Sequence, residues 1–380
     1  MIEVDVIIIG AGASGAGLAF HLAARRRVLM LEAESAPGYH STGRSAALYT
    51  PNIGPPPVRA INQAGSAFFA SPPEGLAQAP LLTRRGGLTI ARPGAEARLA
   101  ATLALSSAAH PVRAIDAAAA RALAPFVRPE QIGAAAYEPG VMDMDVAAIH
   151  QLYLRSAKRD GAALACSARA TRIERRGGVW RIEAGGTIAQ APVVVNAAGA
   201  WGDAVATLAG VAPVGLVPKR RTAILVEAPG VGAQGPAPLV EVAGEAPYLK
   251  PESGRVMVSP ADETPVAAHD VQPDDMDVAL IVDWLTRLTT IEVKRAPRAW
   301  AGLRSFVADG LPVVGFDPDN AGFFWLVGQG GYGIMMSPTL GRLAAALIVE
   351  GAAPADLTAA GIDVAALAPR RAALCQRLSS

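Results

Sequence analysis

Three glycines and one acid near the start of the sequence have the types and the spacing of a nucleotide site. Gly10, Gly12 and Gly15 stand in the spacing G-x-G-x-x-G, and Glu32 ends the second apolar run that follows them. Glycines at these positions allow a tight turn and a close approach of the backbone to a pyrophosphate. A carboxylate about 20 residues later accepts hydrogen bonds from ribose hydroxyls and repels a 2′-phosphate. The pattern therefore predicts a dinucleotide site that disfavours NADP.

Two arginines in apolar surroundings are a second candidate for chemistry. Arg221 precedes an apolar run, and Arg304 lies within the mainly apolar stretch 301–307. A buried guanidinium group needs an anionic partner. That partner is either a bound ligand or an internal acid such as Asp309.

Other polar residues have more ordinary interpretations. The run 41–45, with its single Arg44, has the small donors and the backbone freedom to wrap a second phosphate or a flavin edge. We interpret the preceding His40 as a loop residue. Asp143 and Asp145 stand before a helical pattern, where capping is favoured over metal binding. We expect no metal site.

Buried strands and helices must position these residues. The run 4–9 is short and almost wholly apolar, which is typical of a strand buried on both faces of a parallel sheet. A helical pattern and a second apolar strand at 28–31 follow. The strands predicted at 193–197 and 323–327 also end in glycine-rich turns, where a cofactor can contact the backbone. We place Pro338 in the first turn of the helix after the last strand, because proline is tolerated there.

The rest of the chain divides into segments of two kinds. Strand-like alternation fills 213–300, interrupted by a helix at 274–288, and alanine-rich helices are predicted at 95–107 and 116–123. We predict an α/β fold with added antiparallel β structure, in which a sheet-rich α+β substrate domain interleaves with a Rossmann-like cofactor domain. The cofactor domain comprises 1–80, 138–212 and 303–380, and the substrate domain comprises 81–137 and 213–302.

Composition excludes several classes of protein. The 380 residues are 51% hydrophobic with a formal net charge of +1, so no basic excess indicates nucleic acid. We find no apolar stretch long enough for a transmembrane helix. Cys166 and Cys375 match no metal or redox spacing and are expected to be free thiols. No basic segment with an apolar leader precedes the first strand, so we expect a cytoplasmic protein without integral membrane contact.

Several blocks of the sequence resemble those of FAD enzymes. The blocks "GAGASGAG…LE", "GYHSTGRSAA", "NAAGAW", "AGLRSFVADG" and "GQGGYGI" are similar to those of the glycine oxidase, sarcosine oxidase and D-amino acid dehydrogenase group. They look closest to those of FAD-dependent D-arginine dehydrogenases. The resemblance covers nearly the whole chain and implies an FAD-binding domain. It implies noncovalent FAD, because neither cysteine falls in a block that would meet the flavin ring. The FAD-binding residues that it implies are Gly10, Gly12, Ala13, Ser14, Gly15, Glu32, Ala33, Ser41, Arg44, Ser45, Ala46, Gly199, Trp201, Gly302, Gly330, Gly331, Tyr332, Gly333 and Ile334.

The resemblance also implies a reaction and a substrate site. The Cα–N bond of an amino acid would be oxidised to an imine as Cα loses a hydride to the flavin, and water would hydrolyse the imino acid to a 2-oxo acid and ammonia. Arg221 and Arg304 would clamp the substrate carboxylate, and Tyr248 would donate its hydroxyl unless it is a core residue. A backbone carbonyl at Gly331 or Tyr332 would receive the amine. We name no general base, because hydride transfer requires position and a deprotonated amine.

The chain departs from the D-arginine dehydrogenases at three positions of the substrate pocket. Those enzymes look to carry His, Tyr and Glu where this chain has Leu48, Ile53 and Gly87. Without the glutamate, a cationic side chain loses its buried partner. We therefore predict a preference for neutral or hydrophobic D-amino acids, with Glu74 or Glu241 as acids that could compensate.

Two alternatives to this function remain open. One is an oxidase of glycine, sarcosine or another N-alkyl amino acid, which would use the same carboxylate clamp. The other is a flavin- or NAD-binding protein without amine chemistry. These residues do not show whether the electron acceptor is oxygen or a quinone. A quinone is compatible with peripheral contact with a membrane, but we find no amphipathic anchor with a basic face.

Overall fold

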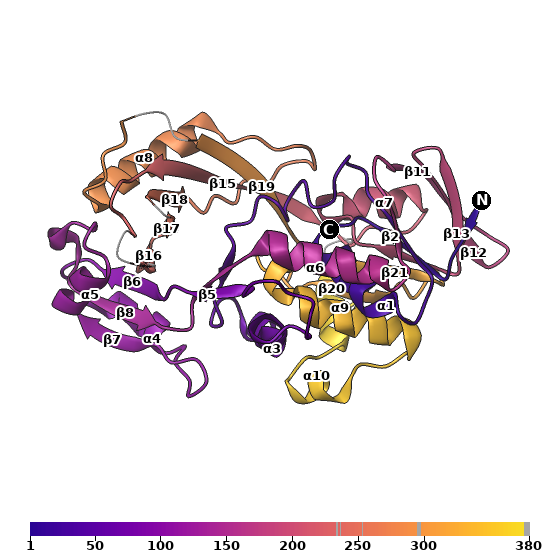
Figure 1. Ribbon diagram of the computed structural model, residues 1–380, viewed down its shortest axis with the longest axis horizontal. Helices are drawn as coiled ribbons and strands as arrows, with labels where there is room; N and C mark the ends of the chain where they lie inside the picture. Colours follow the sequence, from indigo (N-terminus) through magenta and orange to yellow (C-terminus); the bar gives the residue numbers. More distant parts are fainter. Residues whose placement is uncertain (233–234, 236, 253, 295–297, 376–380) are drawn as a thin grey trace.

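The computed structural model describes residues 1–232, 235, 237–252, 254–294 and 298–375, with one large sheet in each of two lobes (Figure 1). The lobe on the right of the view is built on six strands in the order β10 (Ala163–Ala165), β3 (Val28–Leu31), β2 (Val6–Ile9), β14 (Val193–Asn196), β21 (Phe323–Val327) and β20 (Val313–Phe316). The first five strands are parallel, and β20 lies antiparallel to β21. The central strands are apolar runs buried along nearly their whole length, as a parallel sheet covered on both faces requires.

Helices and a smaller sheet cover the two faces of this six-stranded sheet. On one face, a shared apolar cluster includes α1 (Ala13–Leu22), α6 (Val146–Arg159) and α9 (Gly333–Val349). On the other face, a second cluster includes α7 (Gly202–Leu208) and three strands, β13 (Thr187–Ala191), β12 (Val179–Ala184) and β11 (Ala170–Arg176). The exposed β1 (Ile2–Glu3) pairs with β13 and completes a four-stranded sheet. The backbones of α1 and α9 touch, because a Cβ at Gly341 would meet the carbonyl oxygen of Gly17 at 2.7 Å.

The lobe on the left of Figure 1 contains an eight-stranded sheet. Its order is β19 (Arg298–Phe306), β15 (Val217–Glu227), β18 (Arg255–Ser259), β17 (Tyr248–Glu252), β16 (Leu239–Val242), β6 (Gly87–Ala91), β8 (Ala134–Glu138) and β7 (Arg113–Asp116). One face packs against α8 (Asp275–Leu288) and α5 (Ala117–Leu123). Side chains alternate between the faces of a strand, so Arg221 and Ala223 of β15 point away from the α8 side.

Short elements complete the chain. A third sheet consists of β4 (Leu48–Tyr49), β9 (Met142–Met144) and β5 (Leu82–Arg84). The remaining helices are α2 (Pro56–Ala64), α3 (Ser66–Ala70), α4 (Ala100–Leu103), α10 (Ala355–Ala359) and α11 (Ala372–Cys375), with 3-10 turns at η1 (Glu96–Leu99), η2 (Pro129–Gln131), η3 (Gly199–Trp201) and η4 (Ala365–Leu367). In the described part of the chain, no helix is long and apolar enough to span a bilayer.

The predicted fold class is confirmed, and two predictions about helices are wrong. The helix expected at 95–107 is only η1 followed by α4, since most of this segment is exposed and has little apolar surface to bury. Pro338 lies inside α9, beyond its first turn. Proline has no N–H to donate to the carbonyl of Ile334, and the hydroxyl of Ser337 donates to that oxygen instead, at 2.8 Å. A side chain therefore replaces the missing helical hydrogen bond.

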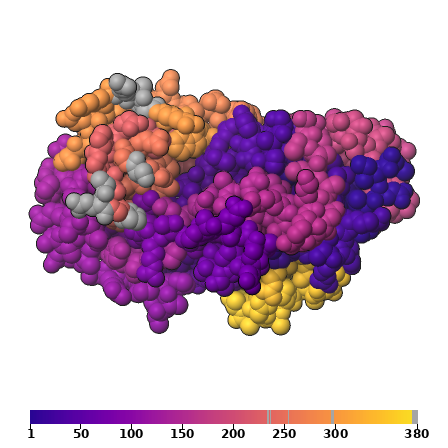
Figure 2. All heavy atoms as spheres, in the orientation of Figure 1, coloured from indigo at the N-terminus to yellow at the C-terminus, as the bar shows by residue number. Residues whose placement is uncertain are grey.

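The segments that form the right-hand lobe come from three separate parts of the chain. Figure 2 shows indigo, magenta and yellow residues, from the start, the middle and the end of the sequence, on one surface. β19 continues from Arg298 to Phe306 and so crosses the predicted boundary at 302. The division into two domains at 80, 137, 212 and 302 stays our proposal.

Candidate active site

Two adjoining clefts run along the carboxyl ends of β2 and β14. The first is lined by residues such as Gly10, Glu32 and Trp201. The second is lined by residues such as Gly12, Arg221 and Arg304. They share lining residues, which are Gly12, Ser41, Thr42, Ala197, Gly199 and Ala200. The clefts therefore form one groove at the edge of the sheet where doubly wound folds bind nucleotides.

The glycines after β2 shape the start of this groove. Gly10 has a φ of +100°, and a Cβ there would lie 2.5 Å from the carbonyl oxygen of Ala197. Gly15 lies outside both clefts, and a Cβ on it would lie 1.9 Å from the oxygen of Gly10, so its role is close packing of helix on strand. Gly12 lines both clefts beside the hydroxyl of Thr42. Ala13 and Ser14, the first residues of α1, line the second cleft, so the N-terminus of this helix borders the space for a phosphate.

Glu32 lies in the first cleft with its carboxylate held by the backbone. Its two oxygens accept hydrogen bonds from the N–H groups of Ala11 and Glu34, each at 3.0 Å. The Nε2 of His150 lies 2.8 Å from the carbonyl of Ala11, and burial lowers the pKa of this imidazole. The neutral ring donates a hydrogen bond to that carbonyl and so stabilises the glycine turn.

The loop after β3 contributes more to the groove than the sequence indicated. Thr42 accepts a hydrogen bond from the N–H of Ala13 at 3.0 Å, and His40 lines the first cleft with its ring 4.5 Å from that of Trp201. Ala168, Arg169 and Ala170 line the same cleft. Thr42 belongs to the run 41–45, which is predicted to contact a phosphate or the flavin, whereas His40 is interpreted from the sequence as a loop residue. Ala168, Arg169 and Ala170 lie in no recognisable motif, because their position depends on how distant strands meet.

Arg44 lines the second cleft, but its guanidinium group is engaged with protein. It donates to the carbonyls of Val271 and Ala301, at 3.2 and 3.0 Å, and forms an ion pair with Asp270. Ser41 similarly donates to the carbonyl of Leu303 at 2.7 Å. These contacts attach the loop to β19 and to the segment before α8. Further predicted residues that line the second cleft are Ala13, Ser14, Ser45, Ala46, Gly302, Gly330, Tyr332, Gly333 and Ile334, while Ala33 lines the first.

Three polar side chains from three strands meet at the second cleft. They are Arg221 of β15, Tyr248 of β17 and Arg304 of β19. A Cβ at Gly331 would lie 2.7 Å from Nη1 of Arg304, so this glycine makes room for the guanidinium group. Burial and the nearby charge of Arg304 lower the pKa of Arg221. Two cations held this close favour an anion between them.

The proposed internal partner of Arg304 is wrong. Asp309 instead pairs with Arg371 through two contacts of 2.7 Å. Among the described residues, no hydrogen bond or ion pair involves the Arg304 side chain. Its guanidinium group therefore faces the cleft with its donors available to a ligand.

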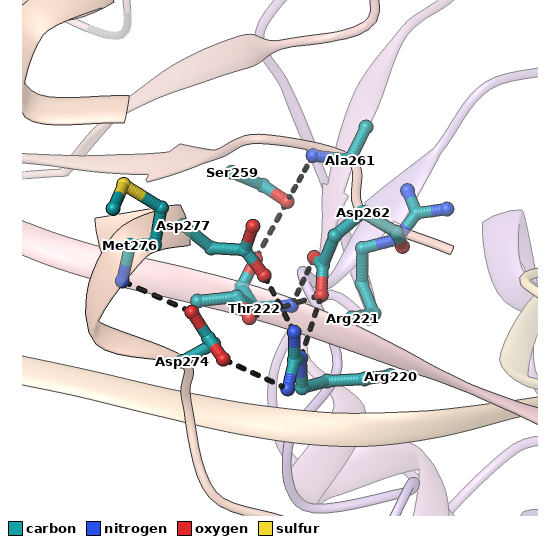
Figure 3. Close-up of polar contacts among 9 residues, drawn as sticks. All are labelled: Arg220, Arg221, Thr222, Ser259, Ala261, Asp262, Asp274, Met276 and Asp277. Carbon is teal, nitrogen blue, oxygen red and sulfur yellow. Dashed lines mark hydrogen bonds and ion pairs between the residues drawn. The ribbon is translucent and has the colours of Figure 1, made fainter. Parts of the chain in front are cut away.

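A polar network fixes the strand that carries Arg221 (Figure 3). The carboxylate of Asp262 accepts from the N–H of Thr222 at 2.6 Å and from its hydroxyl at 3.1 Å. Arg220 contacts the same carboxylate at 3.3 Å and also pairs with Asp277 at 2.8 Å. The carbonyl of Asp262 accepts from Nε of Arg221 at 2.8 Å. Arg221 is thereby oriented before any ligand arrives.

Of Leu48, Ile53 and Gly87, the three positions expected to set substrate preference, one lines a cleft. Leu48 lines the second cleft. Among the described residues that line either cleft, Ile53 and Gly87 do not occur. Ile53 packs against the apolar cluster of α1 and α9, and a Cβ at Gly87 would lie 2.8 Å from Val141. Val141 therefore occupies the space that a side chain at 87 would need.

The remaining acids and thiols are placed as follows. Glu74 is exposed, and burial raises the pKa of Glu241, which is paired in register with Tyr248. Asp145 caps α6 by accepting from the N–H of Ala148 at 2.8 Å. Cys166 is half-buried, and burial raises the pKa of its thiol. The side chain of Cys375 lies outside the described part of the chain.

A glycine turn, a buried acid and a groove closed by a second sheet define a dinucleotide-dependent enzyme. Residues 5–347 match the model of the FAD dependent oxidoreductase family, DAO. The chain belongs to this family, and the protein is an FAD-dependent oxidoreductase. The N-terminus of α1 beside the cleft, the side-chain-free Gly12 and the acid Glu32 fit the pyrophosphate and ribose of FAD.

Proteins similar to this chain include a glycine oxidase and an L-proline dehydrogenase. The glycine oxidase of Geobacillus kaustophilus (strain HTA426) is 30% identical over 177 residues, 46% of this chain and 44% of that protein. The chain thus spans less than half the length of this curated relative. The crystal structure of glycine oxidase from Geobacillus kaustophilus has a TM-score of 0.82 at 22% identity, covering 98% of this chain and 99% of that one. L-proline dehydrogenase from P. horikoshii has a TM-score of 0.83 at 19% identity, covering 97% and 98%. These two likenesses show the fold.

Proposed function

We propose that this enzyme oxidises the Cα–N bond of D-amino acids, giving 2-oxo acids and ammonia after hydrolysis of the imino acid. The observation that carries the proposal is the pair of guanidinium groups of Arg221 and Arg304 beside the hydroxyl of Tyr248 at the second cleft. Planar guanidinium groups bind carboxylates through paired, charge-assisted hydrogen bonds. The similarity to glycine oxidase supports an amino acid as the substrate whose carboxylate binds there.

Each residue of the cleft has a defined task in this proposal. Arg221 and Arg304 hold the carboxylate, and Tyr248 donates its hydroxyl to it. A backbone carbonyl of Gly331 or Tyr332 accepts a hydrogen bond from the amine, which must be deprotonated. FAD, bound without a covalent link, supplies the acceptor for the hydride of Cα. The residues of the chain contribute orientation, which raises the rate without a dedicated base.

The lining of the second cleft supports a preference for neutral or hydrophobic side chains. Leu48, Ala223 and Met335 contribute apolar surface. No acidic side chain occurs among the described residues that line this cleft, so a cationic substrate side chain would find no partner there. The D configuration rests on the resemblance of the sequence blocks.

Anaerobic reduction of the bound flavin by a panel of amino acids tests the proposal. We expect D-leucine, D-methionine and D-phenylalanine to bleach the flavin absorbance, with higher kcat/KM than D-arginine and than the L-enantiomers. A higher kcat/KM for D-arginine would contradict the predicted side-chain preference. Failure of every amino acid to reduce the flavin would contradict the reaction itself. Admission of air then shows whether oxygen reoxidises the flavin or whether a quinone is needed.

An oxidase of glycine or sarcosine is the second candidate, and the similarity to glycine oxidase favours it. The same carboxylate clamp would serve both substrates. Oxygen consumption with sarcosine, compared with D-alanine, separates the two functions. Faster turnover of sarcosine would replace the D-amino acid proposal with this one.

A further inference from the structure

Glu263 lies at the edge of the carboxylate clamp and contacts two cations. Its Oε2 accepts a hydrogen bond from Nζ of Lys219 at 2.8 Å, and its Oε1 accepts one from Nη2 of Arg221 at 3.0 Å. The side chain is 48% exposed. The ammonium group of Lys219 and the charges of Arg221 and Arg304 lower the pKa of this carboxyl. Glu263 is therefore ionised at neutral pH.

The geometry of Arg221 leaves room for a second carboxylate. Its Nε donates to the carbonyl of Asp262, and its Nη2 donates to Glu263. A guanidinium group has five N–H donors in a planar fork. These two contacts leave the remaining donors, including those on Nη1, for a ligand in the cleft. Glu263 thus shares Arg221 with any carboxylate that binds beside Arg304.

We propose that Glu263 is a resident counter-ion of the clamp, which balances Arg221 in the empty enzyme and weakens the hold on a bound carboxylate so that product can leave. This inference rests on the proposed function, because it assumes that the clamp receives a carboxylate. Two carboxylates that share one guanidinium group repel each other. The repulsion raises the dissociation constants of substrate and product alike, and it favours release of the 2-oxo acid at the end of the cycle.

The sign of the effect separates this proposal from a structural role. If Glu263 only oriented Arg221, its removal would weaken carboxylate binding. If it repels the bound carboxylate, Glu263→Gln, which keeps an oxygen acceptor and loses the charge, strengthens binding. Since half of the side chain is exposed, solvent screens the repulsion. We expect a dissociation constant about fivefold lower in the variant at low salt.

The test is an equilibrium titration of the FAD-loaded enzyme with 4-methyl-2-oxopentanoate, followed through the flavin absorbance. Glu263→Gln should bind it about fivefold more tightly than the wild type, with a lower KM for the amino acid and no rise in kcat. The difference should shrink in 0.5 M salt, because screening weakens the repulsion. Glu263→Asp, which keeps the charge, should show no tightening. Asp283→Asn removes an exposed carboxylate that pairs with Arg287 on α8, and it should leave binding unchanged.

The outcomes distinguish the two proposals. Equal or weaker binding by Glu263→Gln, in a protein with normal FAD content and melting temperature, overturns the counter-ion role while the clamp stands. Tightening in Glu263→Asp as well would show that charge is not the cause. If the wild type binds no carboxylate at all, the proposed function fails together with this inference.

Discussion

Arg304 and Gly331 act as a pair at the scale of single residues. The guanidinium group of Arg304 lies against the backbone of Gly331, in space that a Cβ would fill, and it has no partner among the described residues. An arginine without an internal partner in a partly buried position is held ready for an anion. We therefore expect Arg304 to contribute to the binding of a substrate carboxylate.

Replacing Arg304 should reduce substrate use strongly. Arg304→Met removes the charge and the fork, and we expect kcat/KM for the best amino acid to fall about 100-fold, mainly through KM. Arg304→Lys keeps the charge without the planar fork, so its kcat/KM should lie between those of the wild type and Arg304→Met. Arg287→Met, an exposed arginine of α8, is the matched control and should keep wild-type kinetics. Steady-state kinetics measure all three, and a wild-type KM in Arg304→Met would refute the clamp.

Glu138 links the stability of the protein to pH. Burial raises its pKa from 4.5 to about 7, and Asn52 donates a hydrogen bond to its Oε1 at 3.0 Å. Between these two values the folded chain keeps a proton that the unfolded chain releases. Stability from this group is therefore complete below pH 4.5 and is lost as the pH rises through about 7.

The corresponding experiment follows the melting temperature from pH 5 to pH 8. The wild type should lose stability across this range, and Glu138→Gln, which cannot ionise, should lose less. Glu74→Gln changes an exposed acid and serves as the control. Parallel curves for the wild type and Glu138→Gln would show that this carboxyl does not govern the pH dependence.

At the scale of elements, the start of α9 depends on one hydroxyl. The hydroxyl of Ser337 donates to the carbonyl of Ile334, to which Pro338 has no N–H to donate. The same hydroxyl lies 3.0 Å from the hydroxyl of the fully buried Tyr153. Because the first of these contacts uses its proton, Ser337 accepts from Tyr153. Ser337 of α9 thus satisfies two polar groups, the carbonyl of Ile334 in its own helix and the buried hydroxyl of Tyr153 in α6.

Ser337→Ala should destabilise the protein by about 1–3 kcal/mol, because it leaves both the carbonyl and the tyrosine hydroxyl unpaired. Tyr153→Phe removes only the hydroxyl and should cost less. When Tyr153→Phe is added to Ser337→Ala, the free energy of unfolding should fall little further, because the tyrosine hydroxyl that Ser337→Ala leaves unpaired is then absent. Chemical denaturation gives these differences, and strictly additive losses would contradict the shared role of Ser337.

Strands and helices could be predicted from the sequence where the pattern that specifies them lies within the element itself. The apolar run at 28–31 and the acid after it could be placed because buried parallel strands need continuous apolar residues. β7 and β13 were not predicted as strands, because short strands depend on partners elsewhere in the chain. The alanines of 95–107 indicated a long helix, but helix propensity cannot replace an apolar face.

The site could be predicted to a similar extent. Gly12 and Glu32 follow from a motif with a physical mechanism. Thr42 lies in the run 41–45, which the sequence indicated as a binding segment. His40 and Glu263 could not be found, because each gains its role from a strand or loop far away in the sequence. The choice of Asp309 as a partner of Arg304 failed for the same reason, since Asp309 pairs with Arg371 instead. Sequence proximity is a poor guide to the partners of a buried charge.

At the scale of the whole molecule, the groove lies where both lobes contribute residues. Gly10 and Glu32 come from the six-stranded sheet and its loops, while Tyr248 and Arg304 come from the eight-stranded sheet. FAD in this groove would contact both lobes and bind the folded state alone. Such a ligand stabilises a protein by about 2.7 kcal/mol at a concentration of 100 times its dissociation constant.

Removal of FAD should therefore lower the melting temperature by several degrees, and its return should restore it. ADP matches only the part of the cofactor that fits the first cleft, so we expect it to restore a smaller part of the shift. Thermal unfolding of the stripped protein with FAD, with ADP and without ligand measures this. Equal recovery with ADP and FAD would show that the second cleft adds no stabilising contact.

The position of β21 beside β14 has a consequence for synthesis of the chain on the ribosome. β2 and β14 are both made before β21 (Phe323–Val327), the strand that covers the free edge of β14. The helix α9, which packs against α1, comes later still. Until those residues emerge, the nascent polypeptide presents an unpaired apolar edge. Such edges attract chaperones and favour aggregation. Yield in a foreign host should therefore depend on how long translation leaves that edge uncovered.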